Sequence, residues 1–506
     1  MVLLHLYAGA ALCVLFVSWF VSGVVMMYQG YPGLTARERY AAMPALQCAH
    51  CVIGPIDALA AAGIVNGTTS PRLGMLRERP IWRAMDSTGR WLGVFADDGT
   101  RLAPVSPTAG ADIAMAFLGE PVSVRYRETL VDADQWTLTR TVRNQMPLHR
   151  YDAGDAAGTR LYVSVHGGEV VSVSTRRERW LSWIGAIPHW IYPTLLRRHA
   201  EGWAWLVIAL SGLGTVMSLA GVALGVWQWR WRARRGTRQR RTPYRDLMMR
   251  WHHILGLLFG MVTCTWVFSG MMSMNPGRWS PGSSATATQR IAWMGGPLVP
   301  DTAAARAVPV AMAWRLLSGA GGGSLKELQL TRVAGVSYWV GFTAADSSRM
   351  LAFDSPDRGA QPAPVVREEF TRAELLTNAA RVLPKARMID VALLSTYDSY
   401  YRDQERLLRL PVLRVKFDDP DRTWLYLDPR TGAIAQRREW KSRLERWLYD
   451  GLHDFDFAFL MYRRPLWDMV LITLSIGGAL LSVTGVVISW RYARATLSGH
   501  RRFRKR

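Results

Sequence analysis

The sequence predicts an integral membrane α-helical protein with four transmembrane helices, built as a tandem repeat about a pseudo-two-fold axis, with α+β domains on one side of the membrane. Three observations predict this fold class. The chain contains four long apolar stretches, which have the length of membrane-spanning helices. Two long segments of mixed composition separate them, and the same residues recur at constant spacing in the two halves of the chain.

The four apolar stretches define the predicted spans. They cover residues 1–28, 203–229, 252–274 and 467–490, and each can supply the roughly 20 helical residues that the hydrocarbon core requires. Tryptophan or tyrosine stands at several of their ends, as at membrane–water interfaces. We expect the first stretch to be a retained helix, because no charged segment precedes it and no convincing cleavage site follows it.

Positive charge lies next to these stretches. The chain has 62 Lys and Arg against 39 Asp and Glu. Nine arginines and one acid lie between Arg230 and Arg250, and residues 491–506 include seven basic residues and no acid. Basic loops stay in the cytoplasm, so the loop 230–251 and the tail 491–506 are predicted to be cytoplasmic. The distribution indicates a topology signal, with lipid and not nucleic acid as the partner.

This orientation predicts a bacterial inner-membrane protein with both termini in the cytoplasm. The long segments 29–202 and 275–466 are then periplasmic.

An internal repeat relates the two halves at two constant spacings. In the N-terminal parts His5, Trp19, Ser22 and Gly23 match His252, Trp266, Ser269 and Gly270; in the later parts Asp134, His189, Trp203, Gly214 and Gly221 match Asp398, His453, Trp467, Gly478 and Gly485. Both halves enter the membrane from the cytoplasm. The predicted pseudo-two-fold axis therefore runs along the membrane normal.

Each periplasmic segment has the pattern of short helices followed by short strands. In the second half, 372–383 has helical spacing, and 388–394, 410–417 and 423–427 alternate or run apolar like strands. The first half repeats this with 111–118, 122–129 and 160–164, and each half has an earlier strand pair. We expect two small α+β units per segment.

Several tracts in these segments resemble a known family. The strands and the turn Asp428-Pro-Arg-Thr-Gly432 are similar to the PepSY domain, which makes 29–202 and 275–466 PepSY-like regions 1 and 2. The chain also resembles the PepSY-associated transmembrane family, in tracts 134–137, 185–192, 398–401, 423–432 and 447–456. That family includes iron-regulated inner-membrane proteins and haem-containing ferric-siderophore reductases.

The resemblance implies an oxidoreductase: a b-type cytochrome that takes electrons from quinol or a cytoplasmic donor and reduces a ferric siderophore or other Fe(III) chelate in the periplasm for iron acquisition. An alternative function, which is not enzymatic, is a haem-free membrane-anchored PepSY module for protease inhibition or envelope signalling. Transport of the chelate is a third interpretation, against which stands the near absence of charged residues from the spans.

Histidines are the candidate cofactor ligands, and the repeat sorts them into pairs. His5 is equivalent to His252, and His189 to His453. Equivalent residues can face each other across a two-fold axis, and two imidazoles on opposite faces of one macrocycle are typical of haem b. We therefore expect one or two haems, with His199 as an alternate ligand. The other interpretation is that each histidine is an interfacial polar residue making hydrogen bonds.

The spans also carry stripes of small residues, such as Ser211, Gly214, Ser218, Gly221 and Gly225. These fit either close helix packing or a flat cofactor lying against them.

The remaining candidates are predicted to have structural or surface roles. Cys13 and Cys264 lie in apolar stretches as small buried residues. Cys48 and Cys51 are expected to form a local disulfide, with a metal or redox role as the alternative. Outside the haem pairs, His50, His149, His166 and His500 are expected on the surface. No metal other than haem iron is expected, and the sequence identifies no catalytic residue.

Overall fold

A computed structural model describes residues 1–64, 71–86, 88–119, 121–230, 241–296, 308–319, 323–352, 365–403 and 408–497. The chain divides into two compact units. We call residues 1–31, 178–281 and 443–506 the helical unit, and residues 32–177 and 282–442 the sheet unit. The most basic part of the predicted cytoplasmic loop, 231–240, and the tail from 498 onward lie outside the described residues.

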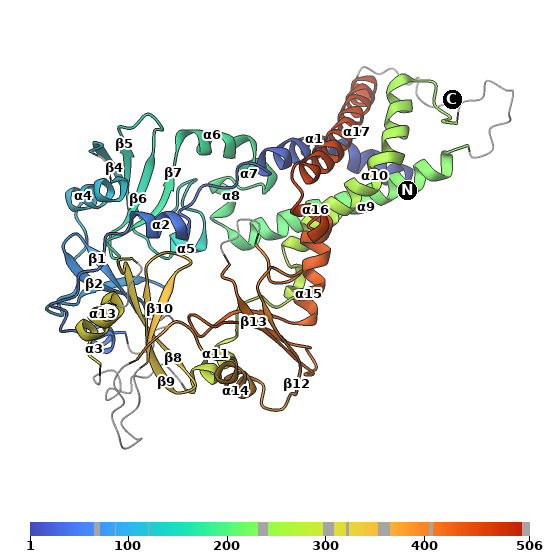
Figure 1. The fold of residues 1–506 in the computed structure, drawn as a ribbon. Coiled ribbons are helices and arrows are strands. Elements are labelled where there is room, and N and C mark those ends of the chain that lie inside the picture. Colours follow the sequence, from blue (N-terminus) through green and yellow to red (C-terminus); the bar gives the residue numbers. More distant parts are fainter. Residues whose placement is uncertain are drawn as a thin grey trace. The chain divides into compact units, whose positions relative to one another are not determined.

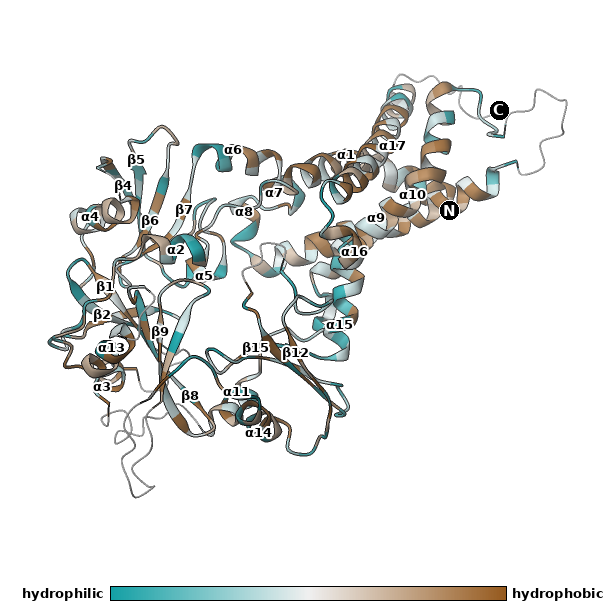
Figure 2. Cartoon of the chain, viewed as in Figure 1, coloured by the Kyte–Doolittle hydropathy of each residue, from teal (hydrophilic) through white to brown (hydrophobic). Residues whose placement is uncertain are grey.

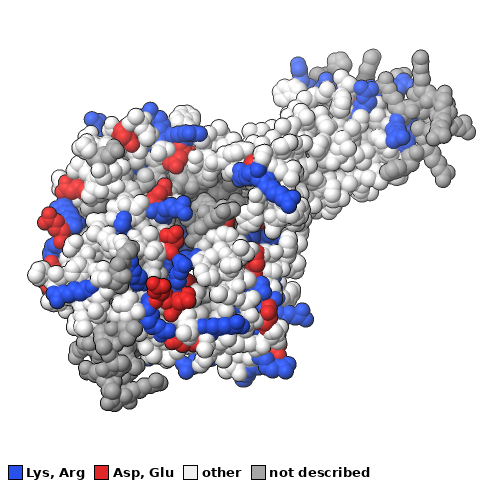
Figure 3. All heavy atoms as spheres, in the orientation of Figure 1, with Lys and Arg blue, Asp and Glu red and all other residues white. Residues whose placement is uncertain are grey.

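Four helices of the helical unit are long and apolar enough to cross a membrane. They are α1 (Val2–Met26), α9 (Ala200–Gln228), α10 (Leu247–Ser273) and α17 (Leu466–Leu497) (Figure 1). They are predominantly apolar along their length (Figure 2), and their visible surface in Figure 3 carries almost no charged side chain between its ends. The prediction of four spans is confirmed.

Helix α10 begins five residues earlier than predicted, and the reason is a cap. The side chain of Asp246 accepts a hydrogen bond from the backbone N–H of Met249 at 3.0 Å. Such a cap satisfies one of the free N–H groups at a helix start.

The four helices pack in a ring, in which α1 contacts α9 and α17, and α10 contacts the same two helices. Glycines allow close approach. A Cβ on Gly214 of α9 would lie 2.8 Å from the ring of Phe16, and one on Gly478 of α17 would lie 2.2 Å from the ring of Phe20. Here the small-residue stripes serve close packing, as expected between helices in lipid.

Short helices connect the long ones. They are α7 (Ala186–His189), α8 (Thr194–Arg197), η1 (Pro276–Arg278), the π-helical turn η3 (Trp447–Gly451) and α16 (Ala458–Met461). Helix α7 contacts α1, and η3 contacts α10. Two further helices, α6 (Arg176–Ile184) and α15 (Trp440–Arg446), run across the boundary between the units.

The sheet unit contains two similar four-stranded antiparallel sheets. One has the order β4-β5-β6-β7 (Val124–Leu130, Leu148–Ala153, Arg160–Ser164, Val170–Ser174) and the other β12-β13-β14-β15 (Met388–Leu394, Val412–Phe417, Trp424–Asp428, Ala433–Arg438). Helix α4 (Pro107–Leu118) packs on the first sheet and α14 (Arg372–Val382) contacts the second. The predicted helices and strands of these segments are confirmed, within a few residues at their ends.

The expectation of two separate α+β units per segment is wrong for the earlier strand pairs. Strands β1 (Arg72–Leu76), β2 (Arg79–Met85) and β3 (Trp91–Phe95) join β8 (Glu327–Val333), β9 (Val336–Phe342), β10 (Ser348–Ala352) and β11 (Val365–Arg367) in one seven-stranded sheet. The junction pairs Leu73 of β1 with Leu328 of β8. Pairing across it satisfies two strand edges that separate units would leave open.

The described part of the sheet unit also contains five short helices: α2 (Ala36–Ala42), α3 (Pro55–Ala61), α5 (Arg140–Arg143), α11 (Ala287–Met294) and α13 (Val310–Gly319). A buried core containing Trp82, Trp339 and Leu317 lies beneath the seven-stranded sheet.

A buried charge network holds the β1–β8 junction. Arg39 of α2 pairs with Glu327 of β8, and Arg72 of β1 pairs with Glu169 of the loop before β7. Burial by itself raises the pKa of Glu327, but the guanidinium groups of Arg39 and Arg72 outweigh burial and hold that pKa below its usual value. Both carboxylates are therefore charged at neutral pH and join strands from the two halves of the chain.

Candidate functional site

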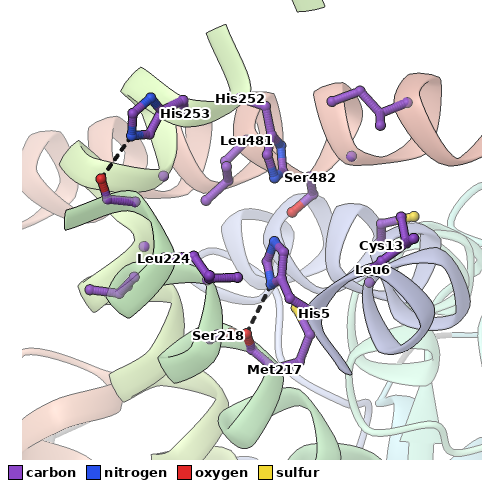
Figure 4. Close-up of a pocket in the computed structure, with 18 of the residues that line it drawn as sticks. His5, Leu6, Cys13, Met217, Ser218, Leu224, His252, His253, Leu481 and Ser482 are labelled. Atoms are coloured by element: carbon purple, nitrogen blue, oxygen red, sulfur yellow. Dashed lines mark hydrogen bonds between the residues drawn. The ribbon is translucent and has the colours of Figure 1, made fainter. Parts of the chain in front are cut away.

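The first predicted pair, His5 and His252, is brought together near the N-terminal ends of α1 and α10. Their ring centroids lie 6.0 Å apart, with an angle of 44° between the ring planes. The two imidazoles point toward each other from α1 and α10, which lie opposite each other in the ring of four helices (Figure 4).

The second predicted pair, His189 and His453, is also brought together. His189 ends α7 and His453 follows η3. Their ring centroids are 5.8 Å apart and the ring planes lie at 70°. These histidines contact the opposite ends of α1 and α10, since His189 lies against Gly23 and His453 against Gly270.

The hydrogen bonds of three of the histidines fix which ring nitrogen carries the proton. His5 Nδ1 contacts the Met217 carbonyl at 3.1 Å, His189 Nδ1 the Trp19 carbonyl at 3.1 Å, and His453 Nδ1 the Trp266 carbonyl at 3.2 Å. A carbonyl can only accept, so each Nδ1 is the donor. In the neutral ring Nε2 then keeps its lone pair.

His252 reaches the same state through a hydroxyl. Its Nδ1 lies 2.9 Å from Thr484 Oγ1, whose own proton is donated to the Leu481 carbonyl at 2.6 Å. The hydroxyl oxygen therefore accepts from Nδ1. Among the described residues, none hydrogen-bonds to Nε2 of any of the four histidines, which is the arrangement that orients metal-binding histidines.

The separation of the rings fits one metal ion per pair. Each metal–nitrogen bond is about 2 Å long and each nitrogen lies roughly 1 Å from its ring centroid, so one ion bonded to both rings would hold their centroids about 6 Å apart. The observed 6.0 Å and 5.8 Å agree with this. No cluster of three or more His, Cys, Asp or Glu side chains suited to a metal occurs in the described parts of the chain. Each pair therefore offers two imidazole nitrogens and no third ligand of these types.

Each imidazole lies against a glycine of another helix. A Cβ on Gly221 would lie 2.5 Å from His5, and one on Gly23 would lie 3.3 Å from His189. Gly485 and Gly270 face His252 and His453 at 3.6 and 3.8 Å. The repeat matches Gly23 with Gly270 and Gly221 with Gly485. The absence of a side chain leaves room for the ring at Gly221 and Gly23, whereas a Cβ at Gly485 or Gly270 would make an ordinary van der Waals contact.

A cavity of about 260 Å³ opens between His5 and His252 (Figure 4). Its walls are mostly small or apolar residues, which include Gly9, Phe16, Gly221, Gly256, Gly260, Leu481 and Gly485, and they also include Gln228 and Tyr244. Ser218 adds a buried hydroxyl that finds no hydrogen-bond partner among the described residues. Such walls suit a flat apolar ligand held by a few polar contacts.

The two pairs lie far apart along the bundle. His5 is on the first turns of α1, and Gly23, which touches His189, is near the other end of the same helix. The intervening helix is about 27 Å long at about 1.5 Å per residue. This is close to the thickness of a hydrocarbon core.

Two other histidines near the spans are placed differently. His199, the alternate ligand, is exposed and forms the N-cap of α9, with no histidine facing it among the described residues. His253 is buried, but its Nδ1 contacts Thr242 Oγ1 at 3.0 Å and its Nε2 contacts the Gly225 carbonyl at 2.8 Å. Both of its ring nitrogens are occupied.

One of the four remaining histidine predictions is wrong. His149 is buried in the β4–β7 sheet, where Nδ1 contacts Thr129 Oγ1 at 2.8 Å and Nε2 contacts the Val105 carbonyl at 2.7 Å. Two hydrogen bonds compensate its burial. His50 is exposed as predicted, His166 is half-buried, and His500 lies outside the described residues.

The cysteines follow their predictions. Cys48 and Cys51 form a disulfide, and both are buried in the core beneath the seven-stranded sheet. Cys13 and Cys264 are buried free thiols within α1 and α10. The disulfide occupies both sulfurs that an alternative metal site would use.

Sequence reasoning missed the residues that orient the histidines. Ser22 Oγ lies 3.2 Å from His189 Nδ1, and Ser269 Oγ lies 3.0 Å from His453 Nδ1. Both serines were matched by the repeat, which could have identified them as partners. Tyr449, which packs beside His453 with centroids 5.5 Å apart, had no such signal; burial raises its pKa, so its phenol stays protonated.

Comparisons with known proteins supply no family: no protein-family model matches the chain, and a search of curated proteins finds no similar sequence.

Proposed function

We propose that this chain is a b-type cytochrome of a bacterial inner membrane that passes electrons from quinol or a cytoplasmic donor to a ferric chelate in the periplasm. One observation carries the proposal: two pairs of facing histidines, each with Nε2 free, lie toward opposite ends of one apolar four-helix bundle. His5 with His252, and His189 with His453, are the residues that would hold the haem. Bound haem would supply reversible one-electron chemistry at both sites.

The chain's own residues hold and shield these sites. Carbonyls of Trp19, Met217 and Trp266 accept hydrogen bonds from the Nδ1–H groups and so leave Nε2 available for a metal. Phe16, Phe20 and Val267 fill the bundle between the two pairs and exclude water from it.

We also propose that the two halves of the chain form a tandem repeat in space. Equivalent residues make equivalent contacts: Trp19 and Trp266 accept from His189 and His453, and Ser22 and Ser269 contact the same imidazoles. A pseudo-two-fold axis along the bundle accounts for this matching. In the proposed arrangement one histidine pair lies near each membrane surface.

The nature of the acceptor rests on the resemblance to ferric-siderophore reductases. Trp136 and Tyr401 are buried in the sheet unit and cannot offer a surface for a chelate, whereas Tyr400 is half-buried against Trp424 at 5.1 Å. The periplasmic regions are proposed to bind the chelate.

The test is a reoxidation experiment on purified protein. Protein reduced with dithionite and freed of excess reductant is mixed with ferric citrate or a ferric trihydroxamate, and the loss of the reduced b-type band is followed together with ferrous iron trapped by a chelator. Stoichiometric reoxidation with matching ferrous iron supports the proposal. A haem-loaded protein that is not reoxidised by either chelate would discard the ferric acceptor, and a colourless protein would favour the haem-free PepSY module.

A further inference from the structure

Arg197 lies just before the membrane-spanning helix α9 and has no carboxylate partner among the described residues. It is the last residue of α8, three residues before α9 begins. Its guanidinium lies over the ring of Tyr192 at 5.3 Å and over the ring of Trp203 at 4.8 Å. Its Nε and Nη1 are enclosed and find no hydrogen-bond partner in the described parts of the chain.

An enclosed guanidinium without an anion is unfavourable. Cation–π contact compensates part of the lost hydration, but donors that are removed from water and left unbonded remain costly. Among the described residues no carboxylate forms an ion pair with Arg197, although many other arginines of the chain have one.

The second half of the chain offers a direct comparison. Trp467, which the repeat matches with Trp203, is also covered by an arginine, with Arg464 lying 4.5 Å above its ring. That guanidinium bonds Asp468 Oδ1 at 2.7 Å. The residue after Trp203 is Ala204, where the second half has Asp468 after Trp467. The first half therefore places an arginine over the matched ring from a different position in the sequence, and it lacks the internal anion.

The rings beneath Arg197 are themselves fixed. Trp203 Nε1 donates to the Ile191 carbonyl at 2.8 Å, and Tyr192 packs against Tyr31 and Trp190 with centroids 5.5 and 5.7 Å apart. The two rings that the guanidinium contacts are thus held in position by other residues. Leu195 nearby is 79% exposed, which is expected of a residue that lies against lipid at the interface and not in water.

We propose that Arg197 binds an anionic oxygen group, a carboxylate or a phosphate, at the outer edge of the bundle. Guanidinium groups recognise both chemistries in the same way, through charge-assisted hydrogen bonds. Two sources fit the position: the phosphate of an anionic phospholipid, which is independent of the function proposed above, and a propionate of haem held by His189 and His453, which rests on it.

The test replaces Arg197 by Gln, with Arg198→Gln, an exposed neighbouring arginine, as the matched control. If the Gln variant does not fold, Arg197→Met is used instead. Its apolar side chain can still pack against the two rings. In the lipid arm, thermal stability in detergent is measured against added phosphatidylglycerol or phosphatidylcholine. In the haem arm, uptake of haem is compared with uptake of haem dimethyl ester, which has no free carboxylate.

Loss of an anion contact weakens binding by about 10- to 100-fold. A phosphate site predicts this loss in the phosphatidylglycerol response, and a propionate site predicts it for haem but not for the ester. Arg197 variants that match Arg198→Gln in both arms overturn the inference. Failure of the proposed function has a different signature, because wild-type protein then takes up neither haem nor its ester.

Discussion

Each of the four histidines is oriented by a hydrogen bond that its Nδ1 donates to another helix or loop. The hydrogen bonds leave Nε2 unprotonated before any ligand arrives. His253 lies beside His252 in the sequence, yet it uses both nitrogens within the protein. Hydrogen bonding, more than position along the helix, separates a candidate ligand from a structural histidine.

The Thr484 hydroxyl gives a residue-level prediction. Thr484→Val removes the acceptor of His252 Nδ1 while keeping the shape of the side chain. We expect haem affinity at the His5–His252 site to fall by about 10-fold or more, as for other partners that orient metal ligands. Haem titration followed by absorbance measures this. Thr215→Val, which removes a hydroxyl bonded within α9, is the control, and equal affinity of the two variants would contradict the orientation argument.

A second residue-level prediction concerns Glu327. Glu327→Gln leaves Arg39 and Arg72 short of a buried partner and should lower the free energy of unfolding by about 3–5 kcal/mol. Glu374→Gln breaks a more exposed pair with Arg367 and should cost no more than about 1 kcal/mol. Chemical denaturation of both variants checks this, and equal losses would contradict the role given to the buried network.

The same network sets a pH dependence. The pKa values of Glu169 and Glu327 are both held below the ordinary value. Their stabilising contribution is therefore fully present above about pH 4.3, the unfolded value, and is lost as the pH falls through the lower folded values. Thermal unfolding of the wild type should show this acid loss, and Glu327→Gln should show less of it. Identical pH profiles would refute the linkage.

Among the elements, local patterns predicted helices and strands well, but not how distant strands meet. Apolar length identified all four long helices, and alternation identified strands such as β12 and β14. The β1–β8 pairing joins residues more than 250 positions apart, and nothing in either strand's own sequence specifies that partner. His149 was misjudged for a similar reason, since its hydrogen-bond partners, the Val105 carbonyl and the Thr129 hydroxyl, lie outside its own strand.

The glycines facing the histidines give a prediction at the element level. Gly221→Ala brings a Cβ to 2.5 Å from His5, whereas Gly256→Ala meets only Leu481, at 3.8 Å. The first variant should displace His5 or separate α1 from α9, with a cost of about 1–3 kcal/mol and loss of haem from that pair. Haem content and thermal stability measure both effects. A Gly221→Ala protein as haem-rich and stable as Gly256→Ala would contradict the proposed fit.

For the whole molecule, the sequence predicted four spans and the pairing of His5 with His252 and His189 with His453. The predicted pairing came from matched positions in the two halves, because equivalent residues near a two-fold axis can face each other across it. This matching could not give the hydrogen-bond partners, which depend on side-chain geometry, or the unneutralised Arg197, which depends on Ala204 standing where the second half has Asp468. The orientation in the membrane rests on charge alone.

That orientation is testable by cysteine labelling. Asp132 and Arg245 are both exposed, and the two native free cysteines are buried. In intact spheroplasts, a membrane-impermeant maleimide should label Asp132→Cys and spare Arg245→Cys until the cells are opened. The reverse pattern would place the sheet unit in the cytoplasm and overturn the predicted topology.

The central claim is that two histidine pairs each hold a haem, and a haem count with a reduced-minus-oxidised spectrum tests it most directly. We predict two b-type haems per chain in the purified wild type, and one in each of the double variants His5→Ala/His252→Ala and His189→Ala/His453→Ala. His199→Ala, which alters an exposed cap, should keep both. A colourless protein that takes up no added haem, or double variants that keep the wild-type count, would contradict the account.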